Sequence, residues 1–370
     1  MALNQVGLER LNDKTTKVIG TNKNVIINGA AMVNQRGDKT GTTTGGFAAD
    51  RFECVMNETG TLTISQAADA PSGFTYSHKL TQTTAQGSLA ANDLTAWRYN
   101  VEGFDVQRFK KGTSDAQEFT VSFHVKSIDQ SSYPVTYILE LRDPINTRSC
   151  CKSYTVTQSD TWEYKTLTFP ADTTGTWTAN NSKSLEMNWF CAAGSNYTGG
   201  TLSTSWATTV TANRAAGLTA NLSANTSNRF AITGVQLEVG SVATDFEHRS
   251  YEDEFQRCLR YYEQMSSYGN SSGYFAVGYN ESGTQCNHCL LYKGYKRANP
   301  TITTNGDANF KNHNTGSSVA LSNLSIQAMT PMSARCEAIS SSSVLTDGGA
   351  AVLSSFDTDD AIIKIDAELS

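Results

Sequence analysis

Residues 232–263 read ITGVQLEVGSVATDFEHRSYEDEFQRCLRYYE. The segment begins as a hydrophobic strand, passes through a short loop, and continues as an amphipathic helix with a capped start. The chain on both sides of it is rich in Gly, Ser, Thr and Asn, and strand-favouring aromatic residues are spread along it. The stretch therefore predicts an all-β protein in which one short helix separates two β-rich regions.

The strand that opens this stretch changes its phase. Phe230 and Ile232 share one face, whereas Val235 begins a run of apolar residues with the opposite parity. An extra residue in a β-bulge restores the core face after such a slip, and glycine tolerates the backbone angles that a bulge needs. We predict a bulge near Thr233 and Gly234.

The helix is expected to begin at Ser250, whose hydroxyl can cap its first turn, within a linking segment of residues 248–265. Apolar residues follow at spacings i, i+3, i+4 and i+7, which places them in one stripe: Phe255, Cys258, Leu259 and Tyr262. Such a stripe must be buried, either between domains or around a symmetry axis. We assign it to assembly.

The clearest strand lies at residues 119–126, FTVSFHVK. Its apolar residues alternate with polar ones, so one face belongs to a core and the other is open. His124 falls on the open face, where it meets solvent or a ligand. The same period of two recurs at residues 135–141 and 185–191, as expected of strands in a β-sandwich.

A chain of 370 residues is long enough for more than one domain. We expect residues 1–24 to form an N-terminal attachment arm and residues 25–247 to form a sandwich. The linking helix at 248–265 follows, and residues 266–370 form a second, smaller β-sandwich-like domain. The last region closes with a strand in which Ile363 and Ile365 alternate with charged residues.

Composition argues against several classes of protein. The formal charge of −6 and the absence of a dense Lys/Arg cluster disfavour nucleic-acid binding. The first residues lack the basic end and apolar core of a secretory signal, and no apolar run approaches the roughly 20 residues that cross a bilayer. We therefore expect no membrane insertion, and we expect the eight cysteines to be buried thiols.

Five segments resemble, in this order, a module that recurs in tail fibres and other host-recognition proteins of tailed bacteriophages, especially phages of marine bacteria and cyanobacteria. They are NVIINGA at 24–30, TVSFHVKS at 120–127, DTWEYKTLTFPADTTGTW at 160–177, AAGSNYTGGTL at 192–202, and the run at 228–263; the closing IIKIDAEL at 362–369 is also similar to such proteins.

This resemblance implies a jelly-roll sandwich of the carbohydrate-binding-module type. It also implies a homotrimer or another multimer on the virion surface, bound to other tail or capsid proteins through the arm at 1–24. Only some two dozen residues precede the module, which favours a short adhesin, a fibre tip or a capsid decoration over a long shaft. Host surface polysaccharide is the expected partner. The alternative is a purely architectural virion part.

Aromatic faces stack on the apolar faces of sugars, so the tryptophans are candidates for glycan contact. All five lie in the first region. Trp189 alternates with apolar residues and is expected in the core, whereas Trp177 and Trp206 stand in polar, loop-like contexts. We predict Trp177 and Trp206 as the ligand-binding residues.

Catalysis is not expected. A glycan-cleaving enzyme needs two carboxylates that face each other across the scissile bond, and the sequence shows neither an obvious pair nor a known nucleophile motif. A polysaccharide depolymerase is the less favoured alternative. Asp357, Asp359 and Asp360 suit a solvated turn or a weak calcium site, and Cys286 and Cys289 alone are too few for structural zinc. We expect no catalytic residue, no metal ligand and no cofactor.

Overall fold

The computed structural model describes residues 22–129, 133–267, 273–306, 310–314, 317–355 and 361–369. The chain divides into two compact units, the first ending at Tyr251 and the second running from Glu252 to Leu369. This division falls within the predicted linking segment. Residues 1–21 of the predicted attachment arm lie outside the described residues, as do the aspartates of the suggested calcium loop.

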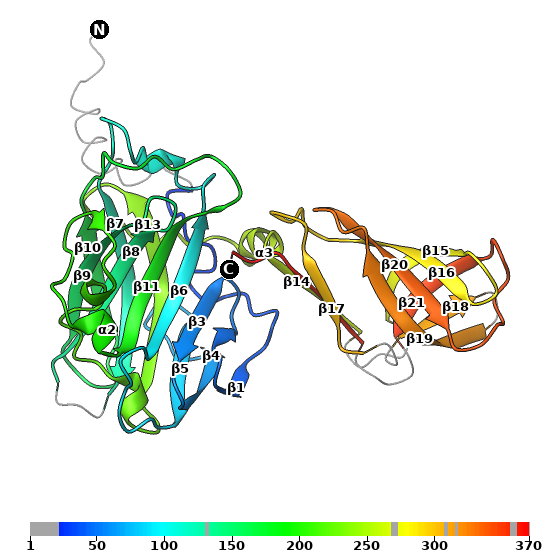
Figure 1. Ribbon diagram of the computed structural model, residues 1–370, viewed down its shortest axis with the longest axis horizontal. Helices are drawn as coiled ribbons and strands as arrows, with labels where there is room; N and C mark the ends of the chain where they lie inside the picture. Colours follow the sequence, from blue (N-terminus) through cyan, green and yellow to red (C-terminus); the bar gives the residue numbers. More distant parts are fainter. Residues whose placement is uncertain are drawn as a thin grey trace, which may run out of the picture. The chain divides into compact units, whose positions relative to one another are not determined.

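Unit 1 is a sandwich of two antiparallel sheets (Figure 1). The six-stranded sheet has the order β1 (Lys39–Thr42), β4 (Thr61–Ala67), β5 (Ser77–Thr84), β13 (Arg229–Val239), β7 (Phe119–Ile128) and β10 (Glu163–Phe169). The seven-stranded sheet has the order β12 (Ala207–Thr208), β9 (Arg148–Val156), β8 (Val135–Asp143), β11 (Lys183–Ala193), β6 (Leu94–Glu102), β3 (Phe52–Asn57) and β2 (Gly46–Phe47). Short helical turns occur at η1 (Gln107–Phe109), α2 (Ser195–Thr198), η2 (Thr211–Asn213) and η3 (Leu222–Ala224).

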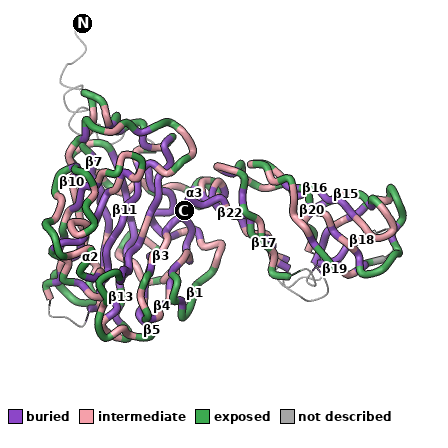
Figure 2. The backbone as a smooth tube through the Cα atoms, viewed as in Figure 1, coloured by how far each residue is buried: buried purple, intermediate pink, exposed green. Residues whose placement is uncertain are grey.

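The chain passes repeatedly from one sheet to the other, since β5 and β7 belong to the six-stranded sheet and β6 and β8 to the seven-stranded one. This crossing pattern confirms the predicted all-β, jelly-roll sandwich. Apolar side chains from both sheets form one buried core between them. Figure 2 accordingly colours much of the length of strands such as β11 as buried. The prediction from the alternation at residues 119–126 is confirmed. Its four apolar residues, Phe119, Val121, Phe123 and Val125, are buried in this core, as is Trp189.

The predicted bulge is present in β13. Its pairing with β7 shifts register between Thr233 and Gln236, and Gly234 has a φ of +62°. On the C-terminal side of the bulge, β13 no longer pairs with β5. The segment that follows Asn24 lies beside β13 there instead, and the Val25 N–H donates to the Leu237 carbonyl. The bulge therefore marks the point where β13 exchanges one neighbour for another.

Helix α3 (Tyr251–Leu259) belongs to unit 2 except for its first residue, and it is shorter than the predicted linking segment. The chain then enters β14 (Tyr262–Ser266), which joins β22 (Ile362–Asp366) and β17 (Thr301–Thr304) in a three-stranded sheet. The other six strands close into a barrel rather than two open sheets, in the order β15 (Tyr274–Asn280), β16 (Gln285–Leu291), β20 (Ser333–Ser340), β19 (Ser317–Gln327), β18 (Phe310–Asn314) and β21 (Ala350–Ser355). The predicted closing strand is present, with Ile363 and Ile365 buried.

Candidate functional site

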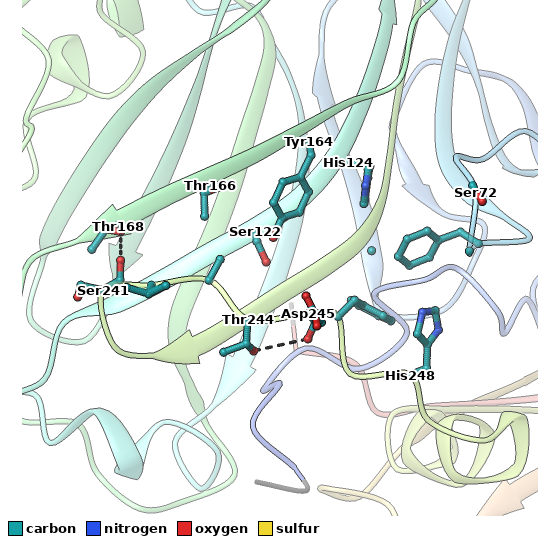
Figure 3. A pocket seen from close by; sticks show the side chains of 16 residues that line it. Ser72, Ser122, His124, Tyr164, Thr166, Thr168, Ser241, Thr244, Asp245 and His248 are labelled. Carbon is teal, nitrogen blue, oxygen red and sulfur yellow. Dashed lines mark hydrogen bonds between the residues drawn. The ribbon is translucent and has the colours of Figure 1, made fainter. Parts of the chain in front are cut away.

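A groove with a volume of about 720 Å³ lies on the outer face of the six-stranded sheet (Figure 3). Strands β7 and β10 form its floor, the β13 bulge lies beside them, and two loops form its walls. The lining residues are Ser72, Gly73, Phe74, Ser122, His124, Tyr164, Thr166, Thr168, Gly234, Ser241, Val242, Ala243, Thr244, Asp245, Phe246 and His248. Four segments that are distant in sequence thus meet at one site.

The floor follows directly from the strand alternation. Because the apolar residues of β7 face the core, Ser122 and His124 must face outward. In the register of β7 with β10, Ser122 lies opposite Thr166 and His124 lies opposite Tyr164. The rings of His124 and Tyr164 are 5.0 Å apart between centroids, and the Tyr164 side chain is half exposed. The floor therefore carries hydroxyl groups at one end and aromatic rings at the other.

An aromatic cluster forms one end of the groove. The Phe74 ring lies 5.2 Å from the His124 ring, 5.1 Å from the Phe246 ring and 5.2 Å from the His248 ring, measured between centroids. The cluster packs against the bulge, where a Cβ on Gly234 would lie only 2.6 Å from Phe74 Cζ. Glycine is thus required at position 234 both by its positive φ and by the close approach of Phe74.

The loop that forms the second wall is held firmly to the sheet. Thr120 Oγ1 donates to the Gly240 carbonyl at 2.7 Å, and Thr168 Oγ1 donates to the Ser241 carbonyl at 3.0 Å. Further along the loop, the Glu238 carboxylate accepts hydrogen bonds from the Thr244 backbone N–H at 2.8 Å and from its hydroxyl at 2.7 Å. A wall fixed in this way offers a ligand a site that needs little reorganisation.

Several polar groups of the floor have no partner among the residues that the structure describes. Among the described residues, the hydroxyls of Ser122, Thr166 and Tyr164 make no hydrogen bond. His124 Nδ1 is likewise buried without a partner, and burial lowers the pKa of this imidazole, so it is neutral near pH 7. The three hydroxyls are free to bind a ligand that both donates and accepts hydrogen bonds, whereas the buried Nδ1 faces the bulge at Gly234.

The prediction that Trp177 and Trp206 face a sugar is wrong. The side chains are 3% and 9% exposed and belong to the core of unit 1. Their rings lie on the buried Lys111, whose Nζ is 5.3 Å and 5.4 Å from the two ring centroids, and Trp206 Nε1 donates to the Pro170 carbonyl at 2.9 Å. The Trp177 ring also contacts Phe109 and the Trp206 ring contacts Phe119, so a polar sequence context does not place these rings in solvent.

The predicted assembly stripe does not form a single helix face. Cys258 and Leu259 are fully buried on α3, Phe255 is partly buried, and Tyr262 lies beyond the helix. Tyr262 begins β14 and pairs with Asp366 of β22. The i, i+7 spacing fails because the helix ends at Leu259, where a strand pairing distant in sequence takes over.

Metal-ligating residues do not gather in the described part of the chain: no group of three or more His, Cys, Asp and Glu side chains is placed to hold an ion. His288, which lies between Cys286 and Cys289, instead contacts the Asn312 amide oxygen at 3.3 Å. Seven cysteines are buried free thiols, as predicted, and Cys289 is an exposed one. None of the described helices combines the length and hydrophobicity that crossing a bilayer requires.

No protein-family model matches the sequence, and no curated protein matches it. Similar solved structures include the enzymatically active domain of tailspike protein 4 of bacteriophage CBA120, at 10% identity and a TM-score of 0.30, covering 59% of this chain and 22% of that one. The family 11 carbohydrate-binding module of the cellulase Lic26A-Cel5E of Clostridium thermocellum is similar at 10% identity and a TM-score of 0.28, covering 58% and 98%. TmCBM61 in complex with β-1,4-galactotriose is similar at 10% identity and a TM-score of 0.29, covering 59% and 99%.

The chain thus spans 22% of the tailspike domain, whereas it covers nearly the whole length of the two binding modules. With TM-scores of 0.28 to 0.30, these likenesses assign neither a family nor a ligand to this chain.

Proposed function

We propose that this chain binds carbohydrate in the groove on the six-stranded sheet and serves as an adhesin. One observation supports the proposal most directly: aromatic rings and unpartnered hydroxyls line the same groove on a β-sheet floor. Tyr164 and Phe74 supply the rings, and Ser122 and Thr166 supply the hydroxyls. Sugars present apolar C–H faces and polar hydroxyl edges, and this combination of surfaces complements both. Rigid strands and an anchored loop hold the groups in place before a ligand arrives.

The proposal extends to the setting in which the protein works. The resemblance of segments such as 120–127 and 228–263 to phage tail-fibre modules supports a virion surface protein of a tailed phage, assembled as a homotrimer or another multimer. Its partners are then other tail or capsid proteins and the host's surface polysaccharide. Asp245 is the one carboxylate among the described lining residues, whereas glycoside hydrolysis ordinarily uses two, which supports binding without cleavage. We also infer that the groove works without a cofactor.

The test is the binding of fluorescently labelled full-length protein to candidate marine bacteria and cyanobacteria, before and after their surface polysaccharide is stripped. Phe74→Ala and Tyr164→Ala should each reduce saturable binding by about tenfold or more, because each removes a stacking face. Phe104→Ala is the matched control, since this side chain is 56% exposed in unit 1 but lies outside the groove.

Binding that is lost on stripping and in both groove variants supports the adhesin. Binding that survives them overturns the assignment to this groove, and an absence of binding under any condition favours an architectural virion part. Shortening of the polysaccharide during incubation would instead identify a depolymerase. The molar mass from light scattering measures the proposed multimer directly.

A further inference from the structure

Lysine and arginine are absent from the described residues that line the groove. Among these sixteen residues the acidic side chain is Asp245, and the imidazoles are His124 and His248. His124 contributes no charge near pH 7 because burial lowers its pKa. Figure 3 shows the floor instead as a row of hydroxyl groups that leads from Thr168 toward Tyr164.

Lysines close to lining residues already have partners in the protein. Lys165, between Tyr164 and Thr166 on β10, has its Nζ 2.7 Å from Glu163 Oε2. Lys126 follows His124 on the same face of β7, and its Nζ lies 2.8 Å from Asp69 Oδ2 and 3.0 Å from Asp160 Oδ1. Lys23 Nζ donates to the hydroxyl of Thr244 and, at 2.8 Å, to the carbonyl of Asp245. The carboxylates of Glu163, Asp69 and Asp160 thus balance Lys165 and Lys126, and Lys23 shares the Thr244 hydroxyl with the Glu238 carboxylate.

An anionic sugar would therefore be poorly accommodated. A carboxylate or sulfate that enters a groove loses water and is normally compensated by Arg, Lys or several charge-assisted donors. Here the floor offers it the neutral hydroxyls of Ser122 and Thr166, and the net charge of −6 disfavours its approach. A neutral sugar loses less on desolvation and can exchange hydrogen bonds with Ser122, Thr166 and Tyr164.

The groove is also long enough for more than one sugar unit. Tyr164, Thr166 and Thr168 are alternate residues on one face of β10, and four residues of antiparallel strand extend about 13 Å. Three rungs of polar or aromatic side chains thus lie in line along the floor. This arrangement suits a linear oligosaccharide rather than a single sugar.

We propose that the groove selects uncharged oligosaccharides and rejects those that carry uronate, sialate or sulfate groups. This inference rests on the proposed function of the groove and names its ligand class. It places the specificity in the charge of the lining rather than in any single contact.

The experiment compares two series of probes by calorimetry with the full-length protein at neutral pH and low salt. One series contains neutral gluco-, manno- and galacto-oligosaccharides, and the other contains oligoglucuronates, oligomannuronates and oligogalacturonates of equal length. We expect a preference for the neutral series of about tenfold or more. Thr166→Lys, which adds an ammonium group at an exposed position of the floor, should raise affinity for the uronates relative to the neutral probes.

Ser153→Lys is the matched control. Ser153 is exposed on β9 of the opposite sheet, and its substitution by lysine changes the net charge by the same amount as Thr166→Lys. Equal or tighter binding of the uronate series by the natural protein overturns the inference but leaves carbohydrate binding intact. Failure of both series to bind overturns the proposed function, and the inference with it. An equal gain in uronate affinity from Thr166→Lys and Ser153→Lys would show that net charge, not the lining, sets the preference, and would also overturn the inference.

Discussion

Lys111 Nζ lies 2.7 Å from the Asp143 carboxylate at one end of the sandwich, and both side chains are buried. The same ammonium group lies 3.2 Å from Asp172 Oδ2 and donates to the carbonyls of Thr174 and Gly175, each at 2.8 Å. A buried cation so fully surrounded by oxygen atoms fastens the loops to the sandwich.

Lys111→Met should lower the free energy of unfolding of unit 1 by roughly 3–5 kcal/mol, because it removes one partner from a buried ion pair. The measurement is urea denaturation, followed by the fluorescence of the tryptophans, all of which lie in unit 1. Lys152→Met, at a partly exposed position on β9, is the control and should change stability by less than about 1 kcal/mol. Equal unfolding curves for the two variants would contradict the role assigned to Lys111.

Unit 1 should lose stability in acid because of His78. This ring is fully buried against Phe52, its Nε2–H donates to the Asn28 carbonyl at 2.9 Å, and burial lowers its pKa from 6.5 to about 3. The unfolded chain therefore binds a proton below pH 6.5 that the folded chain does not. The contribution of His78 is complete above pH 6.5 and is lost as the pH falls toward 3.

The expected loss is about 1.4 kcal/mol for each pH unit below 6.5. It is measured as the difference in unfolding free energy between about pH 7 and about pH 4.5. His78→Phe removes the titrating group and should make this difference smaller, although it lowers stability at neutral pH because the Asn28 carbonyl keeps the Ala31 N–H as a donor but loses the His78 ring. An identical pH dependence in both proteins would exclude His78 as the source.

Much of the first unit could be predicted from local patterns. Alternation along 119–126 identified the core face of β7, and the change of parity after Ile232 located the bulge, because both depend on neighbouring residues alone. The helix start was also close to the observed Tyr251. The end of the helix was missed because the β14 partner, β22, lies about a hundred residues further along the chain.

The groove could be predicted only in part. The alternation placed His124 on the open face, which the structure places in the groove. Phe74, Phe246 and His248 come from loops whose approach to His124 depends on the tertiary fold, so no sequence spacing reveals it. The prediction for Trp177 failed for the same reason, since its ring lies in the core beside Phe109 and Lys111, which are distant from it in sequence.

Gly234→Ala should weaken binding in the groove. A Cβ at this position would lie 2.6 Å from Phe74 Cζ, so the Phe74 ring must move away from its place beside His124. We also expect a loss of roughly 1–2 kcal/mol in stability, because φ is +62°. Gly217→Ala is the matched control: it has a φ of +86° and no heavy atom within 4 Å of the added Cβ.

Both glycine variants should therefore lose similar stability, but only Gly234→Ala should lose affinity for polysaccharide, measured by calorimetry on the full chain. Equal affinities for the two variants would mean that the position of Phe74 does not matter for binding.

Leu259→Asp should destabilise unit 2 by about 3 kcal/mol or more, since it places a charge in a fully buried position. The surrounding site already contains a buried ion pair, in which Lys296 Nζ lies 2.7 Å from Glu263 Oε2 and also donates to the Leu259 carbonyl at 2.6 Å. Thermal unfolding and light scattering measure stability and assembly in parallel. Gln256→Asp, exposed on the same helix, is the control and should leave both nearly unchanged. If Leu259→Asp also leaves both unchanged, the buried face of α3 stabilises neither the unit nor a multimer.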